Sequence, residues 1–258
     1  MPRSSRYGIA LAAFGALVLT PDALFMRISG LDGWQMLAWR GFGVGSVFWL
    51  FWACLLRREA PLHRLLRPAG LVLVLAQFFN ALLFPMAIAA APVAVVLLAV
   101  ATVPVWAAML SWLALGEPTS RATWVTIAAV LAGIGIAVSG HGDLALNRAA
   151  LTGALCGLGV ALSLATTFVS LRRAPELPLL PALGTGALLA GTTGLLVAGP
   201  GRITDGNVAA ILVTALLILP ASFFSLSQAS RYTQAANVSL LMLLETVQPP
   251  RGQGAVRL

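Results

Sequence analysis

The sequence predicts an all-α polytopic membrane protein. Hydrophobic residues make up 59% of the 258 residues and charged residues 9%, and the mean hydropathy is +0.94. A soluble domain carries about 25% charged residues, so this composition leaves too little charge to cover a water-exposed surface. The apolar residues come in long runs separated by short loops. Since about 20 apolar residues span the hydrocarbon core as one helix, each run predicts a membrane span.

The runs predict eight full helices and a partial ninth. Arg3 and Arg6 precede the first run as in a signal peptide, but no small-x-small cleavage site ends it, so we expect an uncleaved first helix. Gly116 and Pro118 are typical helix-stop residues and close the fourth run. Full helices are expected over 8–28, 34–56, 70–90, 93–115, 122–139, 149–171, 179–198 and 207–229, and a partial ninth over 235–248, where Pro249-Pro250 stops it.

The arginines alternate between rich and poor loops. With the N-terminus in the cytoplasm, ten Arg fall in cytoplasmic loops and three in external loops, which is the positive-inside pattern. We therefore expect a multi-pass protein of the cell membrane, of the bacterial inner-membrane type, with a cytoplasmic N-terminus. The cytoplasmic set is Arg3, Arg6, Arg57, Arg58, Arg64, Arg67, Arg121, Arg172, Arg173 and Arg231, and the external set is Arg27, Arg148 and Arg202.

Several functional classes are excluded at this stage. The net charge of +8 does not indicate nucleic-acid binding, because the sequence has no basic patch with interleaved aromatic residues. Cys54 and Cys156 lie in apolar runs, and His63 and His141 lie in loops without a companion ligand, so no metal or other cofactor is expected. The sequence has no HExxH motif and no GxSxG motif in a plausible context, which argues against an intramembrane enzyme.

A weak internal similarity favours an inverted repeat. Residues 96–103 in the fourth helix and 239–246 in the ninth share a Leu-rich pattern. The ninth helix comes five helices after the fourth, and because five is odd, a repeat of that length must be inverted in the membrane. Inverted repeats are typical of transporters, with the substrate site between the halves near the midplane.

Longer motifs strengthen this interpretation. The segment 80–140 contains AIAAAPVA at 87–94, TVPVW at 102–106, SWLALGE at 111–117 and GIG at 133–135, and WRG stands at 39–41. In these features the chain resembles the EamA-type family of the drug/metabolite transporter superfamily. The resemblance implies ten helices in two inverted five-helix repeats, both termini in the cytoplasm, and movement of small metabolites or drugs.

The end of the chain departs from the family pattern. Family members continue through the ninth helix into a tenth, whereas here the polar run 248–258 follows. We therefore expect a truncated or frameshifted copy with about eight full spans plus a partial ninth. The expected division is a first EamA-like repeat over 1–140, an incomplete second repeat over 149–248 and an atypical polar tail over 249–258.

Ionisable residues within spans are the first candidate site residues, because burying charge in a membrane is costly. Asp22 lies about 14 residues into the first helix and Arg40 about six into the second, and at about 1.5 Å per residue the two reach similar depths. They are expected to line the outer half of one cavity. The alternatives are a purely structural ion pair, or outward snorkelling of Arg40.

Further candidates lie near the midplane of other spans. Polar side chains there can bind a substrate, although hydrogen bonds between helices are the slightly favoured alternative. A proline can kink its helix and free backbone carbonyls, and a tryptophan can form a cavity wall. The remaining substrate-pathway candidates are Gln77, Asn80, Thr102, Pro104, Trp106 and Glu245.

The sequence thus predicts a membrane transporter of small metabolites or drugs that works by alternating access, in the efflux or exchange direction. The alternative is a non-transporting membrane remnant or partner protein. The expected partners are an unspecified small-molecule substrate and the lipid bilayer; homodimerisation is left open and no nucleic-acid partner is expected.

Overall fold

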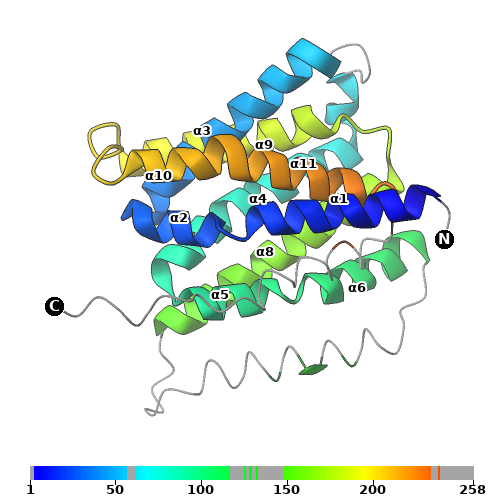
Figure 1. Cartoon of the computed structure of the whole chain (residues 1–258), viewed down its shortest axis with the longest axis horizontal. Coiled ribbons are helices and arrows are strands. Elements are labelled where there is room, and N and C mark those ends of the chain that lie inside the picture. The colour runs from blue at the N-terminus through cyan, green and yellow to red at the C-terminus, as the bar shows by residue number, and fades with distance from the viewer. Residues whose placement is uncertain are drawn as a thin grey trace.

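The computed structural model describes residues 3–56, 62–116 and 148–233, together with residues 125, 128, 129, 132 and 238. All regular elements in these residues are helical, and they pack as a bundle of roughly aligned helices (Figure 1). The expected helix over 122–139, apart from the four isolated residues just named, lies outside the described part. So do most of the partial helix over 235–248 and the whole tail over 249–258.

The first expected helix is broken in two. Helix α1 spans Arg3–Leu19 and α2 spans Asp22–Ser29, with Thr20 and Pro21 between them. Proline lacks a backbone N–H, so it favours a position ahead of a helix or in its first turn over one in the interior. The break makes Asp22 the first residue of α2. Helix α2 ends at Gly30, whose φ of 62° is the left-handed conformation of a helix C-cap.

The next four elements follow the expected order with local changes. Helix α3, Gly33–Phe51, continues as a π-helix over Trp52–Leu56, and a short 3₁₀ helix, Leu62–Leu66, precedes α4, Pro68–Ala90. Asp32 caps α3 by accepting hydrogen bonds from the backbone of Trp34 and Gln35, in a capping box completed by the Gln35 side chain. Helix α4 contains Pro85 and remains one continuous helix through it.

The fourth expected helix is also split. Helix α5 covers Val93–Val100 and α6 covers Val103–Leu115, where a single helix over 93–115 was expected. The physical cause is Pro104, which falls in the first turn of α6 and cannot donate to a preceding helical turn. Helix α6 ends at Gly116, whose φ is 68°, as the helix-stop residues predict.

In the second half, α8 spans Arg148–Arg173 and α9 spans Leu179–Ala198, close to the expected limits. The last expected full span is divided into α10, Val208–Val213, a π-helical turn over Thr214–Ile218, and α11, Leu219–Ala229. Pro220 lies in the first turn of α11, so the π-helical turn accommodates its missing N–H without breaking the span.

Six segments of the described chain are long and apolar enough to cross a membrane, which makes this a multi-pass membrane protein. Helix α3 is not among them, although its 19 residues are long enough, because Gln35 and Arg40 lower its hydropathy. The expectation of eight full spans is thus supported for six of them. The six are Tyr7–Ser29, Pro68–Ala90, Val93–Leu115, Arg148–Arg173, Leu179–Ala198 and Val208–Ala229.

The connections gather at two ends of the bundle. One, here called the Asp32 end, contains the turn between α2 and α3 and the loop from α9 to α10; α2 and α10 lie together at the left in Figure 1. Arg27 Nη2 there donates to Ala91 O at 2.5 Å, and the backbone N–H of Asn207 donates to Ser29 O at 2.7 Å. Contacts therefore join three connections that the alternating topology places on the same side.

The opposite end, here called the Arg64 end, joins the other connections. Arg64 Nη1 donates to Glu176 O at 3.0 Å, and Arg231 Nη2 donates to Leu177 O at 2.7 Å. Burial lowers the pKa of the Arg231 guanidinium, and its bond to Leu177 replaces part of the hydration lost there. The rings of Tyr7 and Tyr232 meet edge to face with their centroids 5.4 Å apart.

Packing between the two halves of the chain builds the core. Helix α3 crosses α9 at Gly41 and Gly191, where an added Cβ on either glycine would collide with backbone of the other helix. Helix α4 packs on α8 and α9, and α1 lies alongside α11 (Figure 1). Small residues at these crossings allow close helix approach, which drives helix association in a bilayer.

Candidate functional site

A buried ion pair joins α2 to α3. Arg40 Nη1 lies 2.6 Å from Asp22 Oδ1 and Arg40 Nη2 lies 2.9 Å from Asp22 Oδ2, so the guanidinium holds the carboxylate by both oxygens. Asp22 is 1% exposed and Arg40 7% exposed. The break before α2 puts Asp22 at the helix N-terminus, where the helix dipole also favours a negative charge. The ion pair, which the sequence left as an alternative for these two residues, is therefore present, in the bidentate geometry that is strongest for arginine and carboxylate.

Two further groups hold Arg40 in place. Its Nη1 lies 3.4 Å from Thr214 Oγ1 in the π-helical turn, and its guanidinium carbon lies 5.6 Å from the ring centroid of Phe84 on α4. Attraction between a cation and an aromatic face strengthens when both are removed from water. Arg40 thus points into the protein and does not snorkel outward.

The ion pair lines a cavity between the two halves of the chain. Its free volume is about 60 Å³, enough for a few water molecules at about 15 Å³ each. Helices α1 to α5 contribute one side of the lining, and α8, α9 and α11 contribute the other. The lining residues used below are Leu19, Asp22, Arg40, Val44, Gln77, Asn80, Ala81, Phe84, Val160, Leu164 and Phe223.

Gln77 and Asn80 lie in the same cavity on α4. They are 3% and 5% exposed, and neither side chain forms a hydrogen bond with any described residue. A buried amide without a partner is costly, so such groups normally bind water or a ligand. The structure thus brings four of the eight expected site residues together around one space.

The other candidates lie elsewhere. Thr102 Oγ1 donates to Ala99 O at 2.7 Å and accepts from Trp106 Nε1 at 3.2 Å, so both side chains are engaged within the α5–α6 break. Pro104 is buried at the start of α6. None of these three residues lines the cavity. Glu245 lies outside the described residues.

The sequence placed the site between the two halves but named no cavity residue on α8, α9 or α11. Val160 and Leu164 on α8 and Phe223 on α11 line the cavity, and Thr214 contacts Arg40. Apolar residues are common in every span, so no local signal distinguished these. No sequence signal pointed to Thr214; its place in a π-helical turn, a feature that often occurs at functional sites, is seen only in the structure.

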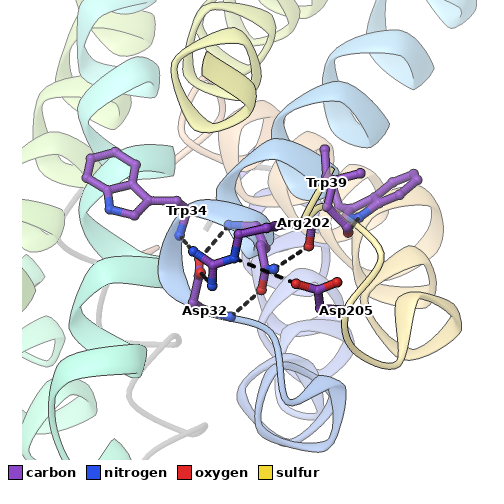
Figure 2. Close-up of polar contacts among 7 residues, drawn as sticks. Asp32, Trp34, Trp39, Arg202 and Asp205 are labelled. Carbon is purple, nitrogen blue, oxygen red and sulfur yellow. Dashed lines mark hydrogen bonds and ion pairs between the residues drawn. The ribbon is translucent and has the colours of Figure 1, made fainter. Parts of the chain in front are cut away.

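A polar clamp closes the Asp32 end (Figure 2). Trp39 Nε1 donates to Ile203 O at 2.8 Å, and the Gln35 amide donates to Arg202 O. The Arg202 side chain lies between two carboxylates, with Nη2 3.3 Å from Asp32 Oδ2 and Nε 3.7 Å from Asp205 Oδ2. The α9–α10 loop is thereby tied to the first turns of α3, the helix that carries Arg40.

An apolar layer accompanies this clamp. Its buried members come from α2, the start of α3, the end of α4, α5 and α10, which are the segments nearest the Asp32 end. Trp39 packs against the same cluster while its indole N–H reaches the loop. The members are Ala23, Met26, Leu31, Met36, Ala87, Ile88, Ala91, Val96 and Ile211.

A known protein family matches the first half of the chain. The model of the EamA-like transporter family aligns with residues 6–139, more than half of the 258 residues. The chain belongs to the EamA-like transporter family. No curated protein matches the chain at a significant level.

Membership in the EamA-like family confirms the resemblance found in the motifs and identifies the chain as a membrane protein of a transporter family. Asp22, Arg40, Gln77 and Asn80 all lie within the matched residues. The lining from α8, α9 and α11 lies beyond them. The cavity of this EamA-like chain is therefore built jointly by the matched segment and by the part that follows it.

Proposed function

We propose that this chain is a secondary transporter that moves small metabolites or drugs across the bacterial inner membrane by alternating access, in the export or exchange direction. The observation that carries the proposal is the cavity between the two halves of the chain. An ion pair and two amides, which have no hydrogen-bond partner among the described residues, stand in its otherwise apolar lining. Polar and charged groups inside a membrane bundle mark substrate pathways, because their burial is otherwise unfavourable.

The helix packing supports an inverted repeat. We assign residues 1–140 to a first repeat and 149–248 to a second, with 249–258 as a separate tail. If span n corresponds to span n+5, the contact of α3 with α9 maps onto itself, and the contact of α4 with α8 maps onto that of α11 with α1. Both contacts are present. A pseudo-two-fold axis between α3 and α9 accounts for this pattern, and it passes beside the cavity.

The two ends support the expected orientation. Arg64, Arg67, Arg172, Arg173 and Arg231 lie at or beside the Arg64 end, whereas the Asp32 end has Arg27, Arg148 and Arg202. Positive charge is retained in the cytoplasm, so we place the Arg64 end and the N-terminus there. The clamp at the Asp32 end then closes the external side, and the cavity opens outward only when the clamp separates.

Alternating access can be tested without knowing the substrate. Ala81 lines the cavity, so an Ala81→Cys variant in a Cys54→Ser, Cys156→Ala background reports whether the cavity opens. In oriented vesicles, a small charged thiol reagent should label this cysteine from either side of the membrane. Ala12→Cys, at a position that is 0% exposed, is the matched control that should stay unlabelled. Labelling of Ala81→Cys from one side only, or from neither, would contradict the proposal.

A further inference from the structure

We propose that the cavity binds the carboxylate of a small apolar acid on Arg40, and that Asp22 is the resident counter-ion, which releases Arg40 by taking up a proton. This inference rests on the proposed function, since the cavity must open for a ligand to enter. It adds the chemical class of the ligand and the charge change that accompanies binding.

Arg40 is already arranged for a carboxylate. Both terminal nitrogens contact the Asp22 oxygens, and the face of Phe84 and the hydroxyl of Thr214 fix the guanidinium from other directions. A planar guanidinium held in this way recognises carboxylates by two parallel bonds, and lysine does not reproduce that geometry. A ligand carboxylate that takes the place of Asp22 makes the same bonds.

The two amides supply hydrogen-bond donors that Asp22 does not occupy. Gln77 and Asn80 face the cavity, are almost fully buried, and have no hydrogen-bond partner among the described residues. Each amide carries N–H donors that the carboxylate of the ligand can use, in addition to those of Arg40. The remaining walls near the pair are apolar, with Leu19, Val44 and Phe223 among them, and suit a ligand with a hydrocarbon or aromatic body.

Charge balance requires a proton. With Asp22 ionised, Arg40 and Asp22 sum to zero, and a bound carboxylate would leave one uncompensated negative charge in a buried, largely apolar space, which is strongly unfavourable. If Asp22 takes one proton from solvent, Arg40 pairs with the ligand and the total returns to zero. The neutral Asp22 carboxyl can then donate a hydrogen bond, for example to an amide oxygen of Asn80.

Among the described residues, the elements packed against α2 offer no second group that could take up this proton. Helices α4, α10 and the π-helical turn pack against α2 and carry no charged or titratable residue, and α3 presents Arg40. Arg27, on α2 itself, donates to Ala91 O at the Asp32 end. Within the described residues, the proton therefore goes to Asp22. A zwitterion would need the ion pair to separate, because both its charged groups would have to enter between atoms of Asp22 and Arg40 that are now 2.6 and 2.9 Å apart. A ligand with a lone carboxylate therefore fits the site better.

The proposal can be tested by calorimetry on the purified full chain in detergent. The probes are phenylacetate, phenethylamine and L-phenylalanine, which share one ring and differ in charge. We expect phenylacetate to bind about tenfold more tightly than the other two, since Arg40 selects a lone carboxylate. Titration in two buffers of different ionisation enthalpy should give an uptake of about one proton for each phenylacetate bound.

Variants separate proton uptake by Asp22 from carboxylate binding by Arg40. Asp22→Asn should bind phenylacetate without proton uptake. Arg40→Gln combined with Asp22→Asn leaves no buried charge unpaired, and it should weaken phenylacetate binding by about tenfold or more. Arg148→Gln, which removes an exposed arginine at the start of α8, is the matched control and should change neither affinity nor proton count. If Asp22→Asn fails to fold, two measurements still test the inference: the proton uptake of the unaltered protein and the affinity of the double variant for phenylacetate.

Three results would overturn the inference. Tighter binding of phenethylamine, or of L-phenylalanine without proton uptake, would assign Asp22 to a ligand ammonium. Binding of phenylacetate that survives in the double variant would remove Arg40 from the site. Failure of all three probes would also reject it, and labelling of Ala81→Cys would then report separately whether the cavity opens.

Discussion

Gly41 on α3 and Gly191 on α9 bring the two halves of the chain into direct backbone contact. A Cβ added to Gly41 would overlap the backbone of Gly191, and a Cβ added to Gly191 would lie 2.7 Å from the backbone nitrogen of Phe42. Arg40 immediately precedes Gly41, so this crossing also sets the position of the guanidinium in the cavity. Few substitutions outside the ion pair should therefore affect the site as strongly as those at this crossing.

Gly41→Ala should destabilise the protein, because backbone cannot move aside as a flexible side chain can. We expect a loss of about 1–3 kcal/mol, the usual cost of overpacking a close contact. Thermal unfolding in detergent measures it. Gly201→Ala is the matched control, since an added Cβ there meets nothing within 4 Å. Equal stability of the two variants would mean that α3 and α9 can separate without cost.

Neutralising one partner of the ion pair should be far worse than neutralising both. Asp22→Asn or Arg40→Gln alone leaves a buried charge unpaired and should cost about 3–5 kcal/mol. The double variant should recover much of that loss, and exchanging the two charges should recover part. Unfolding of all four variants in one detergent gives the coupling free energy. Additive losses in the double variant would show that each residue has a separate role.

The clamp at the Asp32 end should depend on the indole of Trp39. Trp39→Phe removes the N–H that donates to Ile203 O and should cost about 1 kcal/mol, the net value of one such bond. Amide hydrogen exchange over residues 199–207 should become faster, because the loop loses one of its ties to α3. Trp106→Phe is the matched control, since its indole bonds to Thr102 within the α5–α6 break. Unchanged exchange in Trp39→Phe would argue against a clamp.

Membrane orientation can be read from two exposed positions. In the background without Cys54 and Cys156, His63→Cys should resist an impermeant thiol reagent in intact cells, and Thr204→Cys should react. Thr204 is preferable to the neighbouring Gly206, where an added Cβ would lie 2.5 Å from Ser29 O. The reverse labelling pattern would invert the topology.

Thr102 and Asn80 should separate structural from site residues. Thr102→Ala removes an acceptor for Trp106 and should cost about 1 kcal/mol of stability while leaving phenylacetate binding unchanged. Asn80→Ala should weaken that binding, because its amide faces the cavity. Calorimetry gives the affinity of the two variants for phenylacetate, and thermal unfolding gives their stability. A weaker affinity in Thr102→Ala would bring the α5–α6 break into the site.

Local sequence rules were sufficient for much of the fold. The apolar run over 179–198 became α9, Leu179–Ala198, because its length and composition match one membrane crossing. They were insufficient at Thr20–Pro21 and Ala101–Thr102, where single apolar runs became two helices each. In each case the nearby proline was visible, but whether it bends, breaks or merely interrupts a helix depends on what packs beside it. Pro85 lies within a continuous α4.

The sequence by itself determined the class of the protein, its apolar spans and its family, and it placed Asp22 and Arg40 at similar depth. Composition, run length and the depth of two charges can be read from local sequence. They are informative because unsatisfied backbone groups and unpaired charges have a high free-energy cost in a bilayer. Only the tertiary structure decided that Gln77 and Asn80 join this pair, that Thr102 and Trp106 bind each other away from it, and that Val160, Leu164 and Phe223 close the cavity. Those outcomes depend on which faces of α4, α8 and α11 meet. In a bilayer, where every helix is apolar on all sides, close packing of small residues chooses those faces and periodicity does not.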